Sequence, residues 1–173
     1  ALGYTIDVYR GTVSVEKNLL VYSAFITFFP QLVSGPLMTF SKARCYMQGR
    51  RVSSAEVESG LIRFTMGLSK KLLLAATAAT VADAVFALPA ADLDIRTAWL
   101  GAVCYSLQIF FDFSGYSDMA IGLGKIFGFH FLENFHYPYL SKSATEFWRR
   151  WHMSLGTWFR DYVYIPLGGN RVS

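Results

Sequence analysis

Apolar residues fall into three long runs along the chain, separated by shorter polar segments. The first run, residues 19–40, is about long enough to cross a hydrocarbon core of roughly 30 Å. Pro30 and the turn-forming residues 34–36 interrupt it. Two interpretations are open: a single helix that ends near Phe29 and is followed by an interfacial loop, or a broken helix that lines a cavity.

A mixed segment precedes the second apolar run. Residues 55–71 interleave charged and apolar side chains, which is typical of an amphipathic helix that approaches a membrane from the cytoplasm. Ser53 or Ser54 is expected to cap this helix, with Glu56 or Glu58 close to its start.

The second and third apolar runs predict a span and its return. Residues 72–88 are nearly all apolar, and Pro89 is expected to end that helix. The third run starts near Thr97, but residues 112–118 place two carboxylates, three hydroxyls and a glycine inside it. Such groups cannot face lipid at low cost. Either a short interfacial loop joins two helices there, or the polar segment lines an internal cavity.

Residues 133–171 mix charged and aromatic side chains and contain no uninterrupted apolar run long enough to span. Ser143 is predicted to cap a helix that starts at Ala144, with Glu146 completing a capping box. That helix is expected to continue through the sequence EFWRRWHMSLGTWF. The whole pattern predicts an all-α, multi-span transmembrane helical bundle with broken or interfacial helices.

Composition and charge support a membrane protein. The chain is 53% apolar and 17% aromatic, and its 16% of charged residues is well below the roughly 25% of soluble domains. The 89–97 loop is slightly acidic, so the Lys/Arg excess of the 41–54 loop places that loop in the cytoplasm and the 89–97 loop outside. The basic residues lie at the ends of apolar runs, which argues against nucleic-acid binding. Those of the 41–54 loop are Lys42, Arg44, Arg50 and Arg51.

The two cysteines and the chain ends add little chemistry. Cys45 lies in the basic loop and Cys104 in an apolar run, so both are expected to be free thiols. No metal-ligand spacing is present. The chain begins at Ala1 without Met and stops shortly after a Gly-Gly turn. Residues 1–173 are therefore expected to form one partial domain cut from a longer protein at both ends.

Among three histidines, His152 is the strongest candidate for chemistry. His130 and His136 lie in a connecting segment and are expected to be hydrogen-bonded loop residues. His152 lies in a Trp- and Arg-rich helix, where an imidazole should point inward. A neutral imidazole there can act as a general base or as a hydrogen-bond donor to a hydroxyl, and a purely structural role is the alternative.

Three segments carry a family resemblance: FFPQLVSGPL at 28–37, FFDFSGYSDMAIGLGKIFGF at 110–129, and NFHYPYLSKSATEFWRRWHMSLGTWFRDYVYIPLGGNR at 134–171. They resemble the membrane-bound O-acyltransferase family, MBOAT. The similarity is closest to its bacterial branch, which includes alginate O-acetylation and teichoic-acid D-alanyl transfer proteins. It covers almost the whole chain from about Leu19.

The resemblance implies a many-helix transmembrane enzyme that transfers an acyl group from an activated donor to a hydroxyl. It implies a catalytic role for the histidine of the WRRWH motif, His152. The family's main catalytic histidine lies in a later Trp-His-Gly context, which this sequence does not contain. The fragment alone is therefore expected to be inactive.

Further substrate-binding candidates are Arg149, Arg150, Asp112 and Ser114. Together with Arg160, the first two could hold an anionic donor such as coenzyme A or a phosphopantetheine group, or could simply anchor the protein by the positive-inside rule. No bound cofactor or metal is expected, because the acyl donor, acetyl-coenzyme A or a carrier-linked acyl group, acts as a co-substrate.

The resulting hypothesis is an O-acyltransferase of the bacterial cytoplasmic membrane, multi-pass and in contact with lipid. It takes an acyl group, most simply acetyl, from a cytoplasmic donor to hydroxyls of a cell-surface polysaccharide such as alginate. Transfer is either direct or through an extracytoplasmic acyltransferase partner. D-alanyl transfer from a carrier protein to teichoic acid is an alternative. A channel or transporter subunit lined by Asp112 and Asp118 is an alternative of another class.

Overall fold

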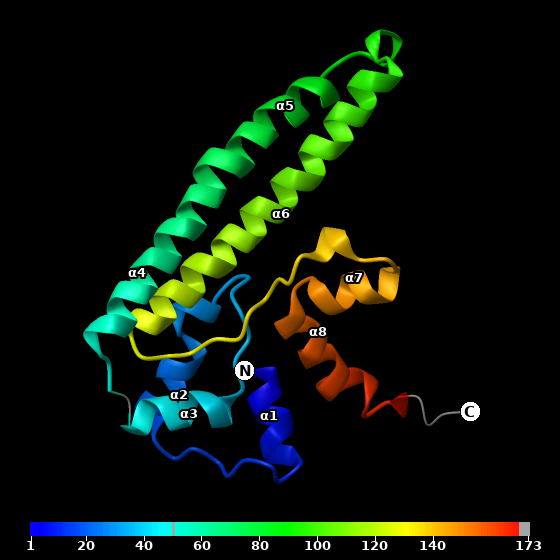
Figure 1. The fold of residues 1–173 in the computed structure, drawn as a ribbon. Coiled ribbons are helices and arrows are strands. Elements are labelled where there is room, and N and C mark those ends of the chain that lie inside the picture. The colour runs from blue at the N-terminus through cyan, green and yellow to red at the C-terminus, as the bar shows by residue number, and fades with distance from the viewer. Residues whose placement is uncertain (50, 170–173) are drawn as a thin grey trace.

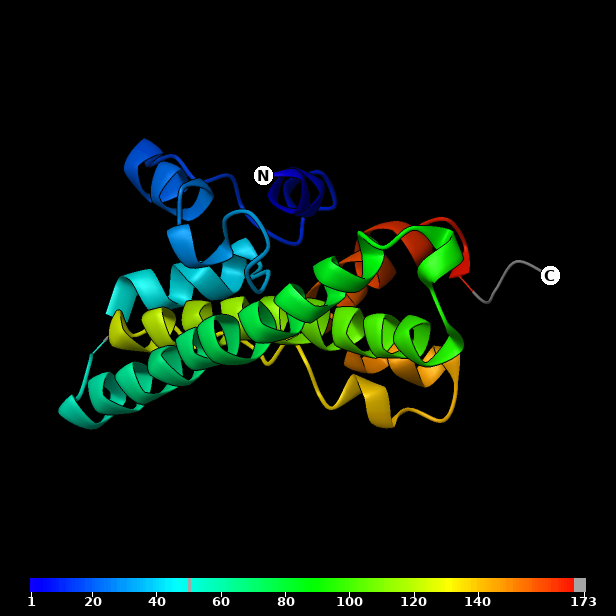
Figure 2. The same ribbon diagram turned by 90° about the horizontal axis from the view of Figure 1, so that it is seen from above.

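The computed structural model describes residues 1–49 and 51–169, and within these residues the secondary structure is helical, with no strand. A long antiparallel helical hairpin forms the axis of the molecule, and both views place its two arms side by side (Figures 1 and 2). Shorter helices from the two ends of the chain lie against one half of this hairpin. The expectation of an all-α fold is confirmed.

The first arm of the hairpin is one continuous helical stretch. It consists of α4 (Ser54–Ser69), a π-helical segment η2 (Lys70–Ala75) and α5 (Ala76–Phe86). Ser53 and Glu56 form the predicted capping box: Ser53 Oγ accepts from the Glu56 N–H, and the Glu56 carboxylate accepts from the Ser53 N–H. The wider π turn allows the consecutive residues Lys70 and Lys71 both to reach the second arm.

The second arm is α6 (Ile95–Ile126), a single helix of 32 residues that starts at an Asp94 cap. The short loop that was one of two expectations for residues 112–118 is therefore wrong. The polar residues of that stretch do not break the helix because their carboxylates find cations on the first arm. Asp118 bonds to Lys70, and Asp112 bonds to Lys71.

Glycines let the two arms approach each other at the backbone. A Cβ added to Gly67 would lie 2.5 Å from the Gly115 carbonyl oxygen, and one added to Gly60 would lie 2.7 Å from the Gly122 oxygen. The reciprocal Cβ atoms at Gly115 and Gly122 would be equally close to the facing backbone. The same seven-residue spacing on both helices thus brings two pairs of glycines into register across the interface.

The N-terminal part comprises α1 (Leu2–Tyr9), α2 (Leu19–Ile26), η1 (Phe29–Gln31) and α3 (Phe40–Gly49). The end of α2 agrees with the interpretation in which a helix stops before Pro30. The expected 41–54 loop is wrong in its first part, where α3 forms instead. Its helical course buries Phe40 and Ala43 against Phe25. Arg50 lies outside the described residues.

The C-terminal part begins with an extended strap, residues 127–137, which runs back along α6 (Figure 1). Phe129 and Phe131 of the strap pack with Ile121 of α6 in a second apolar cluster. The strap leads to η4 (Pro138–Leu140), α7 (Ala144–Arg150), α8 (Met153–Phe159) and η5 (Arg160–Tyr164). The predicted continuous helix from Ala144 is therefore wrong, because it breaks at residues 151 and 152.

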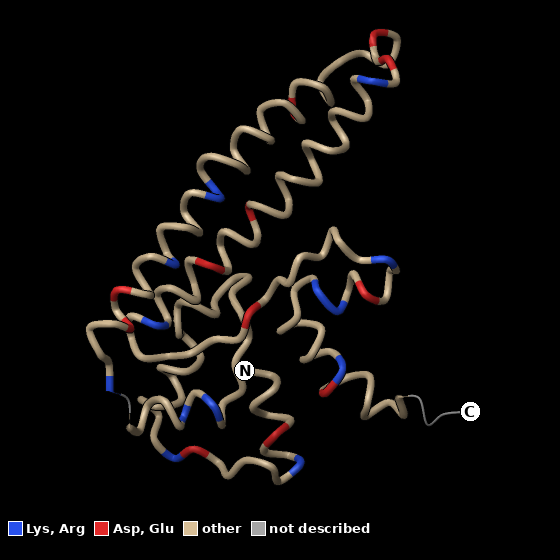
Figure 3. The backbone as a smooth tube through the Cα atoms, in the orientation of Figure 1, with Lys and Arg blue, Asp and Glu red and all other residues tan. Residues whose placement is uncertain are grey.

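Charged residues are distributed unevenly along the hairpin (Figure 3). The acidic 89–97 turn joins α5 to α6 through η3 (Ala90–Asp92) and lies at the end of the hairpin away from α3. The basic and acidic segments thus lie at opposite ends of the two long arms. No helix among the described residues combines the length and the apolar character needed to cross a membrane. The remaining residues, 170–173, are outside the part that the structure describes.

Candidate active site

His152 occupies the corner between α7 and α8. Its backbone is left-handed, with φ 45° and ψ 53°, and the preceding Trp151 is extended. A non-glycine residue in this region is uncommon and costs about 1–3 kcal/mol, so it persists only where contacts with the surroundings offset that cost. The corner therefore turns the chain sharply at the one residue that the sequence predicts to be catalytic.

Two backbone hydrogen bonds from the strap hold this corner. The Met153 N–H donates to the Asn134 carbonyl oxygen at 2.9 Å, and the His136 N–H donates to the Arg150 carbonyl oxygen at 2.9 Å. Together they align the strap with the chain on both sides of His152, as a short ladder would. The left-handed conformation is thus supported from outside its own helices.

The Asn134 side chain lies at the centre of the site. It is 1% exposed, and its Oδ1 atom lies 3.1 Å from His152 Nδ1. The same oxygen accepts from the Ser154 N–H at 3.1 Å and from the Ser154 hydroxyl at 2.9 Å. A backbone N–H can only donate, so the Ser154 amide fixes which end of the Asn134 amide faces the histidine.

This arrangement assigns the tautomer of His152. Because Oδ1 can only accept, Nδ1 of the imidazole must carry the proton and donate it to Asn134. In the neutral ring, Nε2 is then the basic nitrogen with a free lone pair. Within residues 1–49 and 51–169 no hydrogen bond engages Nε2. The geometry favours the role of proton acceptor over that of hydrogen-bond donor at Nε2.

Aromatic side chains surround the imidazole. The ring of Phe113, on α6, meets that of His152 edge-to-face with centroids 4.8 Å apart. Phe113 also contacts Phe135 and Trp151, which pack edge-to-face on each other at 5.0 Å. Burial in this environment lowers the pKa of His152 below its ordinary value. The imidazole is therefore neutral near pH 7, as a general base must be.

The predicted substrate-binding residues on α6 lie close in sequence to Phe113 but point elsewhere. Asp112 is exposed and pairs with Lys71 on the first arm. Ser114 is 3% exposed, and its hydroxyl has no partner among the described residues. Neither side chain makes a hydrogen bond with His152 in that part of the chain. The structure thus does not bring these two residues together with the imidazole.

The predicted arginines lie on the helices that flank the corner. Arg149 is exposed, and Arg150 pairs with Glu146 of the same helix at 2.6 Å. Arg160 pairs with its neighbour Asp161 at 2.8 Å. Of the other two histidines, His130 contacts Glu56 at 3.2 Å, which confirms a bonded loop residue.

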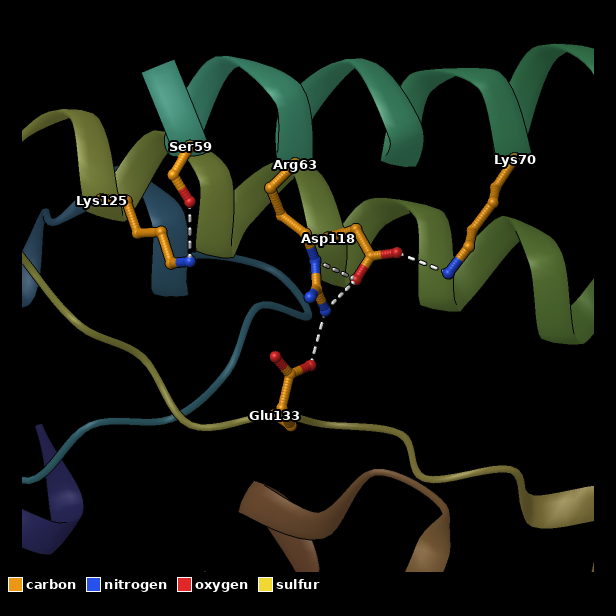
Figure 4. Close-up of polar contacts among 6 residues, drawn as sticks. All are labelled: Ser59, Arg63, Lys70, Asp118, Lys125 and Glu133. Carbon is orange, nitrogen blue, oxygen red and sulfur yellow. Dashed lines mark hydrogen bonds and ion pairs between the residues drawn. The ribbon is translucent and has the colours of Figure 1, made fainter. Parts of the chain in front are cut away.

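A network of ion pairs ties the strap to the hairpin, as Figure 4 shows. Asp118 is 5% exposed and receives Arg63 on one oxygen and Lys70 on the other, each at 2.6 Å. Arg63 also bonds to Glu133 of the strap at 2.5 Å. Glu133 directly precedes Asn134, so the residue that contacts His152 is anchored through one neighbour to both arms of the hairpin.

Sequence reasoning missed Asn134, Ser154 and the Arg63–Glu133 pair. Asn134 lies 18 residues before His152 and 20 residues before Ser154 in the sequence, and no local pattern links it to either residue. Their only available signal was their presence in the segment 134–171 that carries the resemblance. The contact of Glu133 with Arg63 spans 70 residues and had no signal in the sequence.

Within the described residues the fold is all-helical, and an amide holds a neutral, partly buried histidine. The Nε2 atom of this histidine can accept a proton from a hydroxyl. Comparison with known proteins identifies the family: residues 13–173 match the model of MBOAT, the membrane-bound O-acyltransferase family. The chain belongs to this family, and the predicted resemblance is confirmed.

Similar curated proteins come from several bacteria. The chain is 50% identical over 171 residues to a probable alginate O-acetylase of Pseudomonas fluorescens, which covers 99% of this chain and 34% of that protein. It is 40% identical over 159 residues to a peptidoglycan O-acetyltransferase of Helicobacter pylori, covering 90% and 30%. A teichoic acid D-alanyltransferase of Bacillus subtilis is 34% identical over 148 residues, covering 82% and 36%. The chain therefore spans about a third of the length of these relatives.

Proposed function

We propose that the protein to which this chain contributes is an O-acyltransferase that transfers an acetyl group to hydroxyls of a cell-surface polysaccharide, with His152 as a proton acceptor. The observation that carries the proposal is the Nδ1–H hydrogen bond to Asn134, which leaves Nε2 basic. Family membership and the names of the O-acetylating relatives support the same chemistry.

The proposed step is acyl transfer from a thioester donor, acetyl-coenzyme A or an acetyl group on a carrier. The acceptor hydroxyl gives its proton to His152 Nε2 as its oxygen attacks the acyl carbonyl. The new C–O bond forms, the C–S bond of the donor breaks, and the histidine returns the proton to the leaving thiolate. Atoms and charge balance without any oxidant, reductant or metal.

The second part of the proposal is a membrane location, which would give the enzyme access to a donor on one side of the membrane and an acceptor on the other. The outer faces of the hairpin expose large apolar side chains, which include Leu72, Leu73, Trp99, Leu100 and Val103. A helix that is apolar on its outer as well as its inner face needs lipid or further helices around it. We propose that the hairpin is embedded in the bacterial cytoplasmic membrane as part of a multi-span bundle, with the basic α3 end facing the cytoplasm.

The predicted donor contacts remain part of the proposal. Arg149 is exposed and has no ion-pair partner in the described residues, so it is the best placed of the predicted arginines to meet an anionic donor. Arg150 and Arg160 each already pair with a carboxylate. Of the two predicted residues on α6, Asp112 is paired with Lys71, whereas the buried Ser114 hydroxyl has no hydrogen-bond partner among the described residues.

D-alanyl transfer to teichoic acid uses the same chemistry with a different acyl group, and the similarity to a teichoic acid D-alanyltransferase supports it as the second candidate. Higher identity to the alginate O-acetylase favours acetyl transfer. The channel or transporter alternative used Asp112 and Asp118 as lining residues, and both carboxylates are paired with lysines of the first arm.

The test is ester analysis of surface polymers in the source bacterium. Deletion of the gene should remove one class of ester, and mass spectrometry identifies it as acetyl or D-alanyl. The full-length protein should restore the ester, whereas His152→Ala should reduce it at least about 100-fold while the protein still accumulates. His136→Ala, an exposed histidine of the same strap, is the matched control and should restore wild-type levels. Normal acylation by the His152→Ala protein would refute the proposed role.

A further inference from the structure

We propose that Asn134 is a positioning residue for acyl transfer, whose side-chain oxygen fixes His152 in the Nδ1–H tautomer and so keeps Nε2 available as the base. This inference rests on the proposed function, and it names a residue that acts through the histidine. Asn134 itself does not need to touch either substrate.

The first support is the way in which Asn134 is held. Its carbonyl oxygen accepts from the Met153 N–H, and its side-chain oxygen accepts both donors of Ser154. The side chain therefore cannot rotate away from His152 without breaking bonds to the residues that follow the histidine. With an exposure of 1%, no water would replace those bonds at low cost.

The second support is that the group which accepts the hydrogen bond from His152, the Asn134 amide, carries no charge. In a serine-protease triad a carboxylate holds the histidine, and it also stabilises the imidazolium. The Asn134 amide oxygen fixes the same tautomer but is neutral, so it does not favour protonation of the ring to the same extent. An amide in this position suits a base that must stay unprotonated in a partly buried site. This contrast predicts that replacing the amide by a carboxylate moves the pH dependence of activity upward.

The third support is the link from the strap to the hairpin. Glu133 bonds to Arg63, which in turn bonds to Asp118. On the other side of Asn134, Phe135 packs on Phe113 and Trp151. Asn134 is thus anchored through both of its neighbours, as a residue that must hold another in place should be.

Other ionisable groups around His152 do not duplicate the effect of Asn134. Each carboxylate on the packed elements is already paired with a cation: Asp112 with Lys71, Asp118 with Arg63 and Lys70, Glu133 with Arg63, and Glu146 with Arg150. Burial, and no charged neighbour, accounts for the lowered pKa of the ring. The remaining charged or titratable groups on the strap, α6, α7 and α8 are Arg96, Cys104, Tyr105, Tyr116, Lys125, His130, His136, Tyr137 and Arg149.

The experiment compares two replacements of Asn134 in the full-length protein. Membrane vesicles from the deletion strain, complemented with each variant, receive isotope-labelled acetyl-coenzyme A, and label transferred to the strain's own polymer is measured against pH. Asn134→Leu keeps the volume but removes the acceptor. It should lower kcat about 10- to 100-fold with little change in KM, because the ring is no longer held in one tautomer and orientation.

Asn134→Asp keeps the acceptor and adds a negative charge beside the ring. It should retain most of the activity near pH 8. The acid limb of the pH profile, where kcat/KM falls as His152 becomes protonated, should move upward by about one pH unit or more, because the carboxylate stabilises the imidazolium. Leu132→Asp is the matched control: it adds a carboxylate two residues away at an exposed position of the same strap and should not move the limb.

The outcomes separate this inference from the proposed function. Unchanged acylation by His152→Ala would overturn the proposed function itself. Loss of acylation in His152→Ala, together with an unshifted acid limb in Asn134→Asp, would overturn the positioning role alone. If Asn134→Leu does not accumulate in the membrane, the position of the limb in Asn134→Asp still decides, because a merely structural role would change the amount of protein without moving the limb.

Discussion

The hairpin and the His152 corner are built in opposite ways. The hairpin consists of two long helical arms whose backbones meet at paired glycines, and its first arm is continuous through a π-helical segment. The corner consists of two helices of seven residues each, joined at a left-handed histidine and held by one asparagine from a distant strap. Damage to the hairpin should therefore appear mainly as lost stability, and damage to the corner mainly as lost activity or local order.

The largest loss of stability is expected at the closest approach of the two arms. Gly67→Leu places side-chain atoms where a Cβ alone would already lie 2.5 Å from the Gly115 carbonyl oxygen. The backbone cannot yield as a flexible side chain can, so the arms must separate. We expect the free energy of unfolding to fall by about 3 kcal/mol or more.

Thermal unfolding of the detergent-solubilised full-length protein, followed by circular dichroism, measures this effect. Gly49→Leu is the control, because a Cβ at Gly49 meets no atom within 4 Å. It should change the unfolding free energy by less than about 0.5 kcal/mol. Equal losses at the two glycines would contradict the backbone contact between the arms.

The next largest effect is expected at Asp118, which pairs with two cations on the first arm. Its side chain is only 7% exposed, whereas those of Arg63 and Lys70 are 29% and 31% exposed. Asp118→Asn removes the charge, and the two cations recover part of their hydration. We therefore expect a loss of about 1–3 kcal/mol, less than for a fully buried pair.

Asp112→Asn gives the matched comparison on the same helix. The Asp112 and Lys71 side chains are 51% and 43% exposed, and solvent screens their interaction. The expected loss is below about 1 kcal/mol in the same unfolding assay. A larger loss at Asp112 than at Asp118 would show that burial does not set the strength of these pairs.

A smaller and local effect is expected at the start of α7. Ser143 Oγ accepts from the Glu146 N–H at 3.1 Å, and the Glu146 carboxylate accepts from the Lys142 N–H at 2.8 Å. Ser143→Ala should cost about 1 kcal/mol and increase hydrogen exchange of the α7 amides without changing exchange in α6. Thr145→Ala, on the same turn, should leave exchange unchanged, and a matching increase there would argue against the cap.

The same contrast explains how far the sequence could predict the structure. Local signals were sufficient for the first arm of the hairpin and its turn: the Ser53–Glu56 cap, the amphipathic 55–71 segment and the turn near Pro89 all appear in the structure. The loop that was one of two expectations for 112–118 does not form, because the carboxylates there are neutralised by Lys70 and Lys71, on the other arm. No local pattern shows such pairing.

At the corner, local signals were misleading. Propensity and the Ser143 cap predicted one helix through His152, whereas Asn134 draws the chain into a left-handed turn there. The histidine itself was identified from its motif, but its tautomer depends on an atom 18 residues away in the sequence. The sequence thus singled out the histidine that lies at the corner and could not predict what holds it there.

The smallest expected effect is the pH dependence of stability at the corner. Burial lowers the pKa of His152 in the folded protein, so between the folded and unfolded pKa values the unfolded chain binds more protons. The stabilising effect of the neutral ring is fully present above the unfolded pKa of about 6.5 and is lost as the pH falls below it. Unfolding measured from about pH 7.5 to about pH 5.5 should therefore show a larger decline in wild type than in His152→Gln. His130 and His136 are present in both proteins, so the difference isolates His152. A steeper decline in the variant would mean that the folded ring is charged and could not serve as the base.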